Sequence, residues 1–204
     1  MTDLSLHCRC GALRGTLRDV SARRVNRLVC YCHDCRAFAQ LCGGDALDEA
    51  GGTEIWQCAL DRVTFEAGIE RLTCVRLSPR GLHRWRAACC DAAIANTLAT
   101  PSFPFGGIVG AVIDAPDRER DAAVGRVRGA VFAASAPARP LHPALGPLGY
   151  AAAGRTTLGV VAKARWRGAH RRSPFHRDGH PRAEPVVLDP DRVAQLKARP
   201  VPVG

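Results

Sequence analysis

Signals for export or membrane insertion are missing from this sequence. The first residues, Met1-Thr2-Asp3, carry no basic region, and no apolar stretch follows them. No apolar run approaches the roughly 18 to 20 residues that a transmembrane helix needs. We therefore expect a cytoplasmic protein that does not enter a membrane. With 204 residues, 47% of them hydrophobic, the chain is long enough to bury a sizeable core.

The common catalytic signatures are missing as well. No serine-nucleophile motif and no paired-carboxylate arrangement stands out. Segment 106–110 is rich in glycine but lacks the lysine of a phosphate-binding P-loop, so we interpret it as the start of a strand. Lysine itself is scarce, since Lys163 and Lys197 are the only two among 29 basic residues. The abundance of arginine, alanine, glycine and proline is also what a GC-rich coding bias produces. These absences leave cysteine as the main chemical signal.

The chain has ten cysteines, which stand mostly in spacings typical of metal binding. Cys30, Cys32 and Cys35 lie within six residues, and Cys8 and Cys10 form a second close pair. Cysteines this close are poor disulfide partners for one another, and crowded thiolates repel unless a soft cation neutralises them. Zinc is the usual cation, because it accepts sulfur ligands in a tetrahedral shell without redox chemistry. We predict zinc sites; a disulfide scaffold, or a redox thiol at position 30 or 32, is the alternative.

A pair such as Cys8 and Cys10 needs distal partners to complete a four-thiolate site. The remaining cysteines are Cys42, Cys58, Cys74, Cys89 and Cys90. The first three stand alone, within apolar strands or beside glycines, and are predicted to be buried as small hydrophobic residues. The last two lie just after a predicted strand, where a turn can expose them. We therefore predict that Cys89 and Cys90 are the partners.

The apolar pattern predicts a mainly β fold with antiparallel strands. Strands are expected over residues 4–8, 12–17, 26–30, 54–57, 62–66, 71–77, 82–87, 106–113, 126–133 and 186–188. Helices are expected over 35–41, 156–169 and 191–198, and an irregular proline-containing connection over 137–147. We divide the chain into a β domain over 1–135 and a basic, Pro/Arg-rich extension over 136–204 that packs on it.

The order of the motifs carries a resemblance. Cys-x-Cys-Gly begins at Cys8, Cys-x-Cys-x-x-Cys begins at Cys30, Gly-Gly-Thr precedes a strand, and a distal cysteine pair follows an arginine-rich strand. Over residues 4–110 this order resembles the glutathione-dependent formaldehyde-activating enzyme / centromere protein V family. Segments 81–97 and 172–175 are similar to a bacterial subgroup without an assigned substrate. The resemblance implies an Mss4-like (β-tent) fold with a structural zinc and a second zinc at the active site.

The resemblance also implies a ligand set. Cys8 and Cys10 match the structural pair, with Cys89 as the first distal ligand. The second distal cysteine is expected at position 92, which is alanine here, and Cys90 is the available substitute. The active-site ligands match Cys30, Cys32 and Cys35, and the family's histidine between the first two is Tyr31 here.

A zinc ion with three thiolate ligands leaves one position for water or a substrate sulfur. Our first hypothesis is a zinc-dependent carbon–sulfur lyase, similar to S-(hydroxymethyl)glutathione synthase, that handles a small thiol or a thiol–aldehyde adduct. The nearest polar groups for proton transfer are Tyr31, His33 and Asp34, and His33 is also a candidate fourth ligand. The candidates for binding an anionic thiol such as glutathione are Arg36, Arg84 and Arg86, unless these only form a solvated strand face.

The second hypothesis is a non-catalytic, zinc-stabilised binding module that uses the basic C-terminal region. Residues 103–204 carry 16 Lys+Arg against 8 Asp+Glu, whereas residues 1–102 carry 13 against 11. Segment 163–182 holds seven basic residues and one acidic residue, interleaved with Trp166, Phe175 and three histidines. This composition is typical of a surface that binds nucleic-acid phosphates, but also of a solvated arginine-rich helix. No recognised nucleic-acid motif accompanies it, so we rank it second. The sequence leaves the oligomeric state open.

Overall fold

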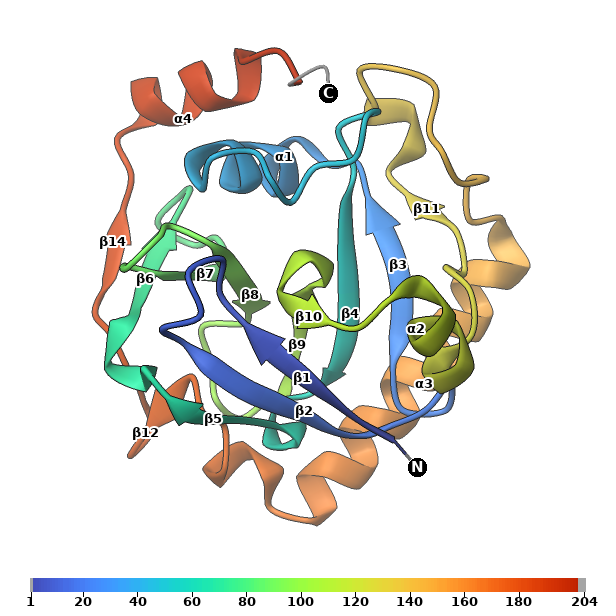
Figure 1. Cartoon of the computed structure of the whole chain (residues 1–204), viewed down its shortest axis with the longest axis vertical. Helices are drawn as coiled ribbons and strands as arrows, with labels where there is room; N and C mark the ends of the chain where they lie inside the picture. Colours follow the sequence, from blue (N-terminus) through green and yellow to red (C-terminus); the bar gives the residue numbers. More distant parts are fainter. Residues whose placement is uncertain (1, 202–204) are drawn as a thin grey trace.

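Over residues 2–201, the computed structural model is mainly β, with three sheets and four α-helices (Figure 1). The smaller of the two main sheets is antiparallel, with the strand order β10-β1-β2-β5. Its strands are β1 (Thr2–His7), β2 (Arg14–Val20), β5 (Val63–Ala67) and β10 (Ile113–Asp114). A two-stranded hairpin of β12 (His176–Arg177) and β13 (His180–Pro181) forms the third sheet.

The larger sheet has eight strands in the order β11-β3-β4-β9-β8-β7-β6-β14. Its central strands are antiparallel, as expected, but each edge strand, β11 and β14, pairs in parallel with its neighbour. A long stretch of chain separates each edge strand from the strand it pairs with, as parallel pairing requires. The strands are β11 (Ala130–Val131), β3 (Asn26–Cys30), β4 (Thr53–Ala59), β9 (Phe105–Val109), β8 (Ala93–Thr97), β7 (His83–Ala87), β6 (Leu72–Arg76) and β14 (Pro185–Val187).

The main core lies where the smaller sheet packs across the larger one, and Figure 1 shows β1 and β2 crossing in front of it. Leu17 of β2 belongs to the same core cluster as Trp56, Trp85 and Ile108 of the larger sheet, and all four side chains are fully buried. Burying each such side chain stabilises the fold by roughly 1.5–3 kcal/mol. The isolated thiols of Cys42, Cys58 and Cys74 are also buried, as predicted.

Two helices pack on each other at one end of the larger sheet, at the top of Figure 1. Helix α1 (His33–Leu41) begins directly after Cys32, and α4 (Pro190–Ala198) begins at its cap, Asp189. Leu196 of α4 is buried against Ala37 of α1. The C-terminal segment therefore contacts the helix that carries Cys35.

Helix α3 (Pro147–Trp166) is longer than predicted, because the proline expected to end an irregular connection instead occupies its first turn. Val160 and Ala164 bury one face of α3 against Ala59 of β4. Of the strand predicted over 126–133, only β11 forms.

Strand β8 and helix α2 are among the elements that were not predicted. Strand β8 is fully buried and lacks an alternating pattern, so its sequence does not mark it as a strand. Helix α2 (Asp117–Val124) is short and polar. Arg27 donates hydrogen bonds to Asp121 at 2.5 Å and to Asp117 at 3.2 Å, and these distant contacts stabilise α2 on the β3 strand.

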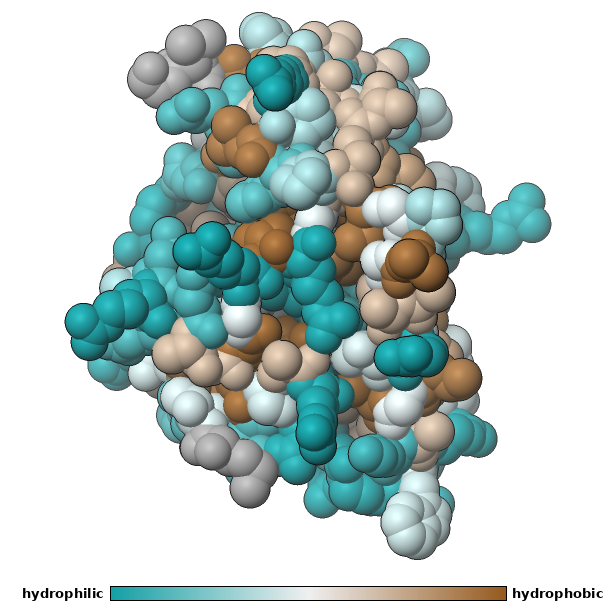
Figure 2. All heavy atoms as spheres, turned by 90° about the vertical axis from the view of Figure 1, so that its right-hand side faces the viewer, coloured by the Kyte–Doolittle hydropathy of each residue, from teal (hydrophilic) through white to brown (hydrophobic). Residues whose placement is uncertain are grey.

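The outer surface is mixed. Figure 2 shows the right-hand side of Figure 1, where hydrophobic residues form small separate areas among hydrophilic ones. Among residues 2–201, no helix has both the length and the apolar content required to cross a bilayer.

Candidate metal centres and their cavity

The fold gathers seven of the ten cysteines into two groups. The four-cysteine cluster consists of Cys8, Cys10, Cys89 and Cys90. The three-cysteine cluster consists of Cys30, Cys32 and Cys35. Within each group all sulfur atoms lie within 4.8 Å of one another. A tetrahedral site with Zn–S bonds of about 2.3 Å places its sulfurs about 3.8 Å apart, so both groups have the dimensions of a metal site.

Two hairpin turns build the four-cysteine cluster. Cys8 and Cys10 lie in the turn between β1 and β2, where Gly11 adopts φ 73°. The Cys8 sulfur lies 3.6 Å from that of Cys10 and 3.7 Å from that of Cys89, and it accepts a hydrogen bond from the Leu13 N–H at 3.3 Å. These spacings are close to the tetrahedral value.

The turn between β7 and β8 supplies the distal pair. Asp91 adopts φ 58°, a left-handed conformation that reverses the chain directly after Cys90. This turn lets the adjacent Cys89 and Cys90 both join the cluster. Ala92 lies beyond the turn, and its carbonyl accepts from the Ala87 N–H at 3.0 Å. Cys90 therefore joins Cys8, Cys10 and Cys89, whereas the family resemblance led us to expect the fourth cysteine at position 92.

Burial raises the pKa of Cys89 to about 12, with a further contribution from hydrogen bonds to Cys10 and Cys8. Thiols packed like this retain their protons until a cation replaces them. Four sulfurs fill a tetrahedral shell, and such closed sites are structural.

The three-cysteine cluster forms where β3 ends and α1 begins. Cys30 is the last residue of β3, and Cys32 caps α1, with its sulfur accepting from the Cys35 N–H at 3.3 Å. Hydrogen bonds from Cys30 and Cys35 lower the pKa of Cys32, and the charge of Arg84 adds to this effect. The pKa of Cys30 is raised chiefly because its thiol donates to Cys32. The cluster thus favours a thiolate at the helix N-terminus, where negative charge is stabilised.

A cavity of about 580 Å³ ends at this cluster. All three cysteines line it, together with Asp34, Arg80 and Arg84. Its other walls are largely apolar and include Ile55, Leu82, Leu98, Phe105 and Phe132. Among the described residues, no further His, Cys, Asp or Glu joins the three sulfurs as a ligand. A metal ion held there would have a coordination position left for a molecule in the cavity.

Arg84 is a fixed positive charge beside the sulfurs. Its side chain is only 4% exposed, and it donates a hydrogen bond to Asn96 Oδ1 at 3.0 Å. The same nitrogen lies 4.0 Å from the Cys35 sulfur, and the guanidinium stacks over Phe38 at 5.5 Å. A buried arginine held on three sides attracts an anion in the cavity without having to reorient.

Asp34 lies at the edge of the cavity. Its carboxylate contacts Lys197 Nζ of α4 at 2.7 Å and lies 3.9 Å from Arg84. The C-terminal helix therefore positions one of the predicted proton-transfer residues.

Tyr31 faces away from the cavity. Its side chain is fully buried, and its hydroxyl donates to Asp48 at 2.9 Å and accepts from the Leu141 N–H at 3.1 Å. Burial raises the pKa of Tyr31 to about 12. The position of Tyr31 therefore does not support the proton-transfer role expected of it. The adjacent Cys30 and Cys32 line the cavity, whereas Tyr31 does not.

Three other predicted residues also lie outside the cavity lining. His33 is exposed, and its Nδ1 accepts from Arg36 at 2.9 Å, so it does not join the three sulfurs. Arg36 is buried and also donates to the Ser135 carbonyl at 3.1 Å. Arg86 pairs with Asp91 at 2.9 Å, beside the four-cysteine cluster. Of the three predicted substrate-binding arginines, only Arg84 lines the cavity.

Sequence reasoning missed Arg80 and Asn96, both of which line the cavity. Arg80 lies in the turn before β7, and Asn96 lies within the unpredicted strand β8. A correct assignment of β8 would have paired Asn96 with Arg84, its partner across β7 and β8.

The basic segment 163–182 does not form one surface. Phe175 is buried against Trp85, at a ring distance of 5.3 Å, whereas Trp166 is 90% exposed. Several of its arginines are held by the protein itself; for example, Arg182 donates to the Pro174 carbonyl at 2.6 Å. The interleaved aromatics and cations of the sequence therefore separate in the fold.

Comparisons with known proteins place the chain in a family. A search of curated proteins finds no match. A crystal structure of a Rhodobacter sphaeroides protein, solved as a structural genomics target, is 19% identical. It covers 57% of this chain and 94% of its own, with a TM-score of 0.38. A family model described as "Family of unknown function (DUF6151)" matches residues 2–186. The chain therefore belongs to the DUF6151 family.

Proposed function

We propose that the three-cysteine cluster binds zinc with one coordination position open to the cavity, and that the protein joins or separates a small thiol and an aldehyde there. The observation that carries this proposal is the cavity of about 580 Å³ that ends at three sulfurs. The motif order that resembles the glutathione-dependent formaldehyde-activating enzyme family supports it. An Mss4-like fold is the architecture that the proposal implies.

The reaction balances without an oxidant or a reductant. The thiol sulfur forms a bond to the aldehyde carbon, the carbon–oxygen π bond breaks, and the oxygen takes up the proton that the thiol loses. A bound zinc ion would supply positive charge that keeps the substrate sulfur deprotonated near neutral pH. The reverse reaction, cleavage of the carbon–sulfur bond, uses the same groups.

The protein's own side chains have distinct tasks in this proposal. Arg84 attracts the anionic thiol and orients it, because its guanidinium is already fixed by Asn96. Asp34 lines the cavity and carries the proton between sulfur and oxygen. The apolar walls formed by residues such as Leu98 and Phe105 exclude water from the adduct.

The test combines metal analysis with an assay in which NMR monitors adduct formation from glutathione and formaldehyde. The protein as purified is expected to contain two zinc ions. Cys32→Ala is expected to contain one zinc ion and to lose adduct formation. The control Cys58→Ala alters a buried thiol outside both clusters and is expected to keep two zinc ions and adduct formation. Unchanged activity in a folded Cys32→Ala variant that has lost one zinc would rule out the proposal.

The second candidate is a non-catalytic module that binds nucleic acid through segment 163–182. The observation that favours it is the exposed side chain of Trp166, three residues after Lys163. Lys163 has no ion-pair partner among the described residues. Binding through phosphates weakens steeply with salt. A titration with single-stranded DNA or RNA decides the matter, and no affinity at about 50 mM salt would dispose of this candidate.

A further inference from the structure

A second cavity, of about 360 Å³, lies apart from both cysteine clusters. It is formed by α3, the turn between β2 and β3, and the end of β4. Among the described residues, six cationic side chains line it and no carboxylate does. We call it the basic cleft, and its cations are Arg23, Arg24, Arg62, Arg155, Lys163 and Arg167.

Helix α3 supplies a row of positive charge to one wall of the basic cleft. Arg155, Gly159 and Lys163 follow at intervals of four residues along one face of the helix, and Arg167, the C-cap residue, comes four residues later. Val160 and Ala59 add an apolar floor. The cleft thus combines converging cations with a small apolar surface.

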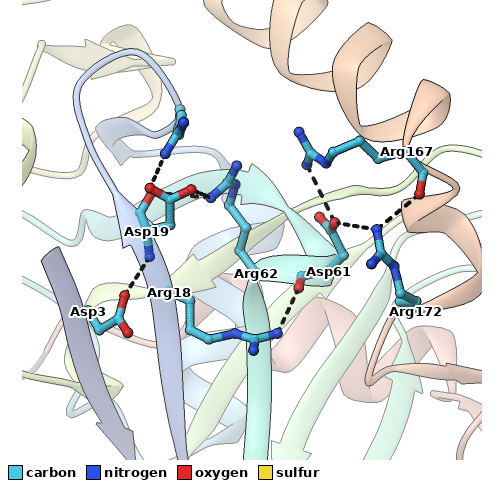
Figure 3. A network of polar contacts seen from close by, with 8 residues as sticks. Asp3, Arg18, Asp19, Asp61, Arg62, Arg167 and Arg172 are labelled. Carbon is cyan, nitrogen blue, oxygen red and sulfur yellow. Dashed lines mark hydrogen bonds and ion pairs between the residues drawn. The ribbon is translucent and has the colours of Figure 1, made fainter. Parts of the chain in front are cut away.

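Two carboxylates orient arginines around the cleft without lining it (Figure 3). Arg62, whose side chain is 11% exposed, donates to Asp19 at 2.5 Å and to its carbonyl at 3.2 Å. Asp61 lies between Arg167, at 3.4 Å, and Arg172, at 3.5 Å. Burial opposes ionisation of Asp19, but Arg62 and Arg24 outweigh it and lower its pKa. The cations still outnumber the carboxylates, so the cleft retains a positive excess.

Gly159 leaves the α3 wall of the cleft without a side chain at that position. A glycine inside a helix costs about 1 kcal/mol relative to alanine. A Cβ atom at Gly159 would meet nothing within 4 Å, so packing does not require glycine there. The residue lines the cleft, and a side chain would project into it. Gly154 also has free space for a Cβ but lies outside the lining, which makes it a matched control.

We propose that the basic cleft binds a small molecule carrying two adjacent phosphoryl groups, such as a nucleoside diphosphate. Guanidinium groups pair with phosphate oxygens in bidentate fashion, and several converging cations match the charge of a diphosphate better than that of a single carboxylate. The volume suits a small ligand. The cations converge on one cleft and do not follow a track, so a nucleic-acid strand fits less well. The site is independent of the proposed thiol–aldehyde activity.

The test measures binding of ADP, pyrophosphate and AMP to the full chain by calorimetry at about 100 mM salt, a concentration that screens weak surface attraction. ADP or pyrophosphate is expected to bind at least tenfold more tightly than AMP. Lys163→Glu and Arg155→Glu are each expected to weaken binding at least tenfold. Arg165→Glu, on the same helix but outside the lining, is expected to leave binding unchanged.

Glycine variants separate the ligand site from helix stability. Gly159→Leu is expected to weaken diphosphate binding at least tenfold while the protein stays folded, because the leucine side chain would fill part of the cleft. Gly154→Leu is expected to leave binding unchanged. No ADP or pyrophosphate binding to the wild type at millimolar concentration would overturn the proposal. So would equal affinity for AMP and ADP, or affinity for a single-stranded oligonucleotide alone.

Discussion

The two cysteine clusters use the same kind of ligand but differ in what surrounds them. The four-cysteine cluster joins two hairpin turns with four sulfurs, which fill a tetrahedral shell. The three-cysteine cluster lies at the end of a strand and the start of a helix, and a cavity of about 580 Å³ reaches all three of its sulfurs. One additional cysteine therefore distinguishes a site suited to structure from a site suited to binding a substrate.

The comparison also shows how position decides the roles of neighbouring arginines. Arg84 and Arg86 are separated by one residue on β7. Arg84 lies against the three-cysteine cluster, and Arg86 pairs with Asp91 beside the four-cysteine cluster. One strand thus contributes a cation near each cluster.

The largest effect is expected from removing Cys90, one member of the distal pair. A structural site contributes its binding free energy to folding, so Cys90→Ala should lower the free energy of unfolding by about 3 kcal/mol or more and remove one zinc ion. Cys32→Ala should remove one zinc ion with a clearly smaller loss of stability. Chemical denaturation with parallel metal analysis measures both. Equal losses in the two variants would abolish the distinction between a structural and an open cluster.

A loss of stability of similar size is expected in acid from the buried His176, which lies beside the buried His83. Its contribution has to be distinguished from the loss of metal in acid. Burial, followed by the charge of His83, lowers the pKa of His176 to about 4. The folded state therefore favours the neutral form of His176. Its contribution to the free energy of unfolding is complete above about pH 6.5 and is lost as the pH falls towards about 4. The size of this contribution is about 3 kcal/mol.

His176→Asn should therefore flatten the decline in stability between about pH 6.5 and 4. The control His180→Asn changes an exposed histidine in the same hairpin and should leave the decline as it is. Unfolding followed by fluorescence across this pH range provides the measurement. An unaltered pH profile in His176→Asn would show that His176 does not cause the acid sensitivity.

A smaller effect is expected at Arg84. Arg84→Gln keeps a hydrogen-bond donor for Asn96 but removes the charge beside Cys35, so catalytic efficiency for the thiol should fall about tenfold, or about 1.4 kcal/mol. Arg86→Gln serves as the control and should leave catalytic efficiency unchanged. A stronger effect in Arg86→Gln would place the substrate near the four-cysteine cluster instead.

The smallest effect is expected at Tyr31. Tyr31→Phe removes the hydrogen bonds to Asp48 and Leu141 and should cost about 1 kcal/mol of stability. Adduct formation should stay unchanged, because the hydroxyl does not line the cavity. An inactive but stable variant would restore the proton-transfer role that the sequence suggested for this residue.

Much of the β architecture follows from local sequence. The strand predicted over 26–30 coincides with β3, and the helix predicted over 35–41 lies within α1. Alternation and turn residues are local properties, so they locate such elements without tertiary information. Helix α2 escaped prediction because ion pairs with Arg27, about ninety residues earlier in the chain, help to hold it.

The sequence by itself determined which cysteines belong together in the three-cysteine cluster, because three thiols within six residues have to be neighbours. Only the tertiary structure decided that Cys90 joins Cys8, Cys10 and Cys89, since this depends on the left-handed turn at Asp91. It also decided that Tyr31 faces away from the cavity. The basic cleft likewise exists only in three dimensions, because α3 brings Arg155 and Lys163 beside Arg62. Short-range spacing fixes contacts within a turn, whereas backbone turns and packing decide which distant side chains meet.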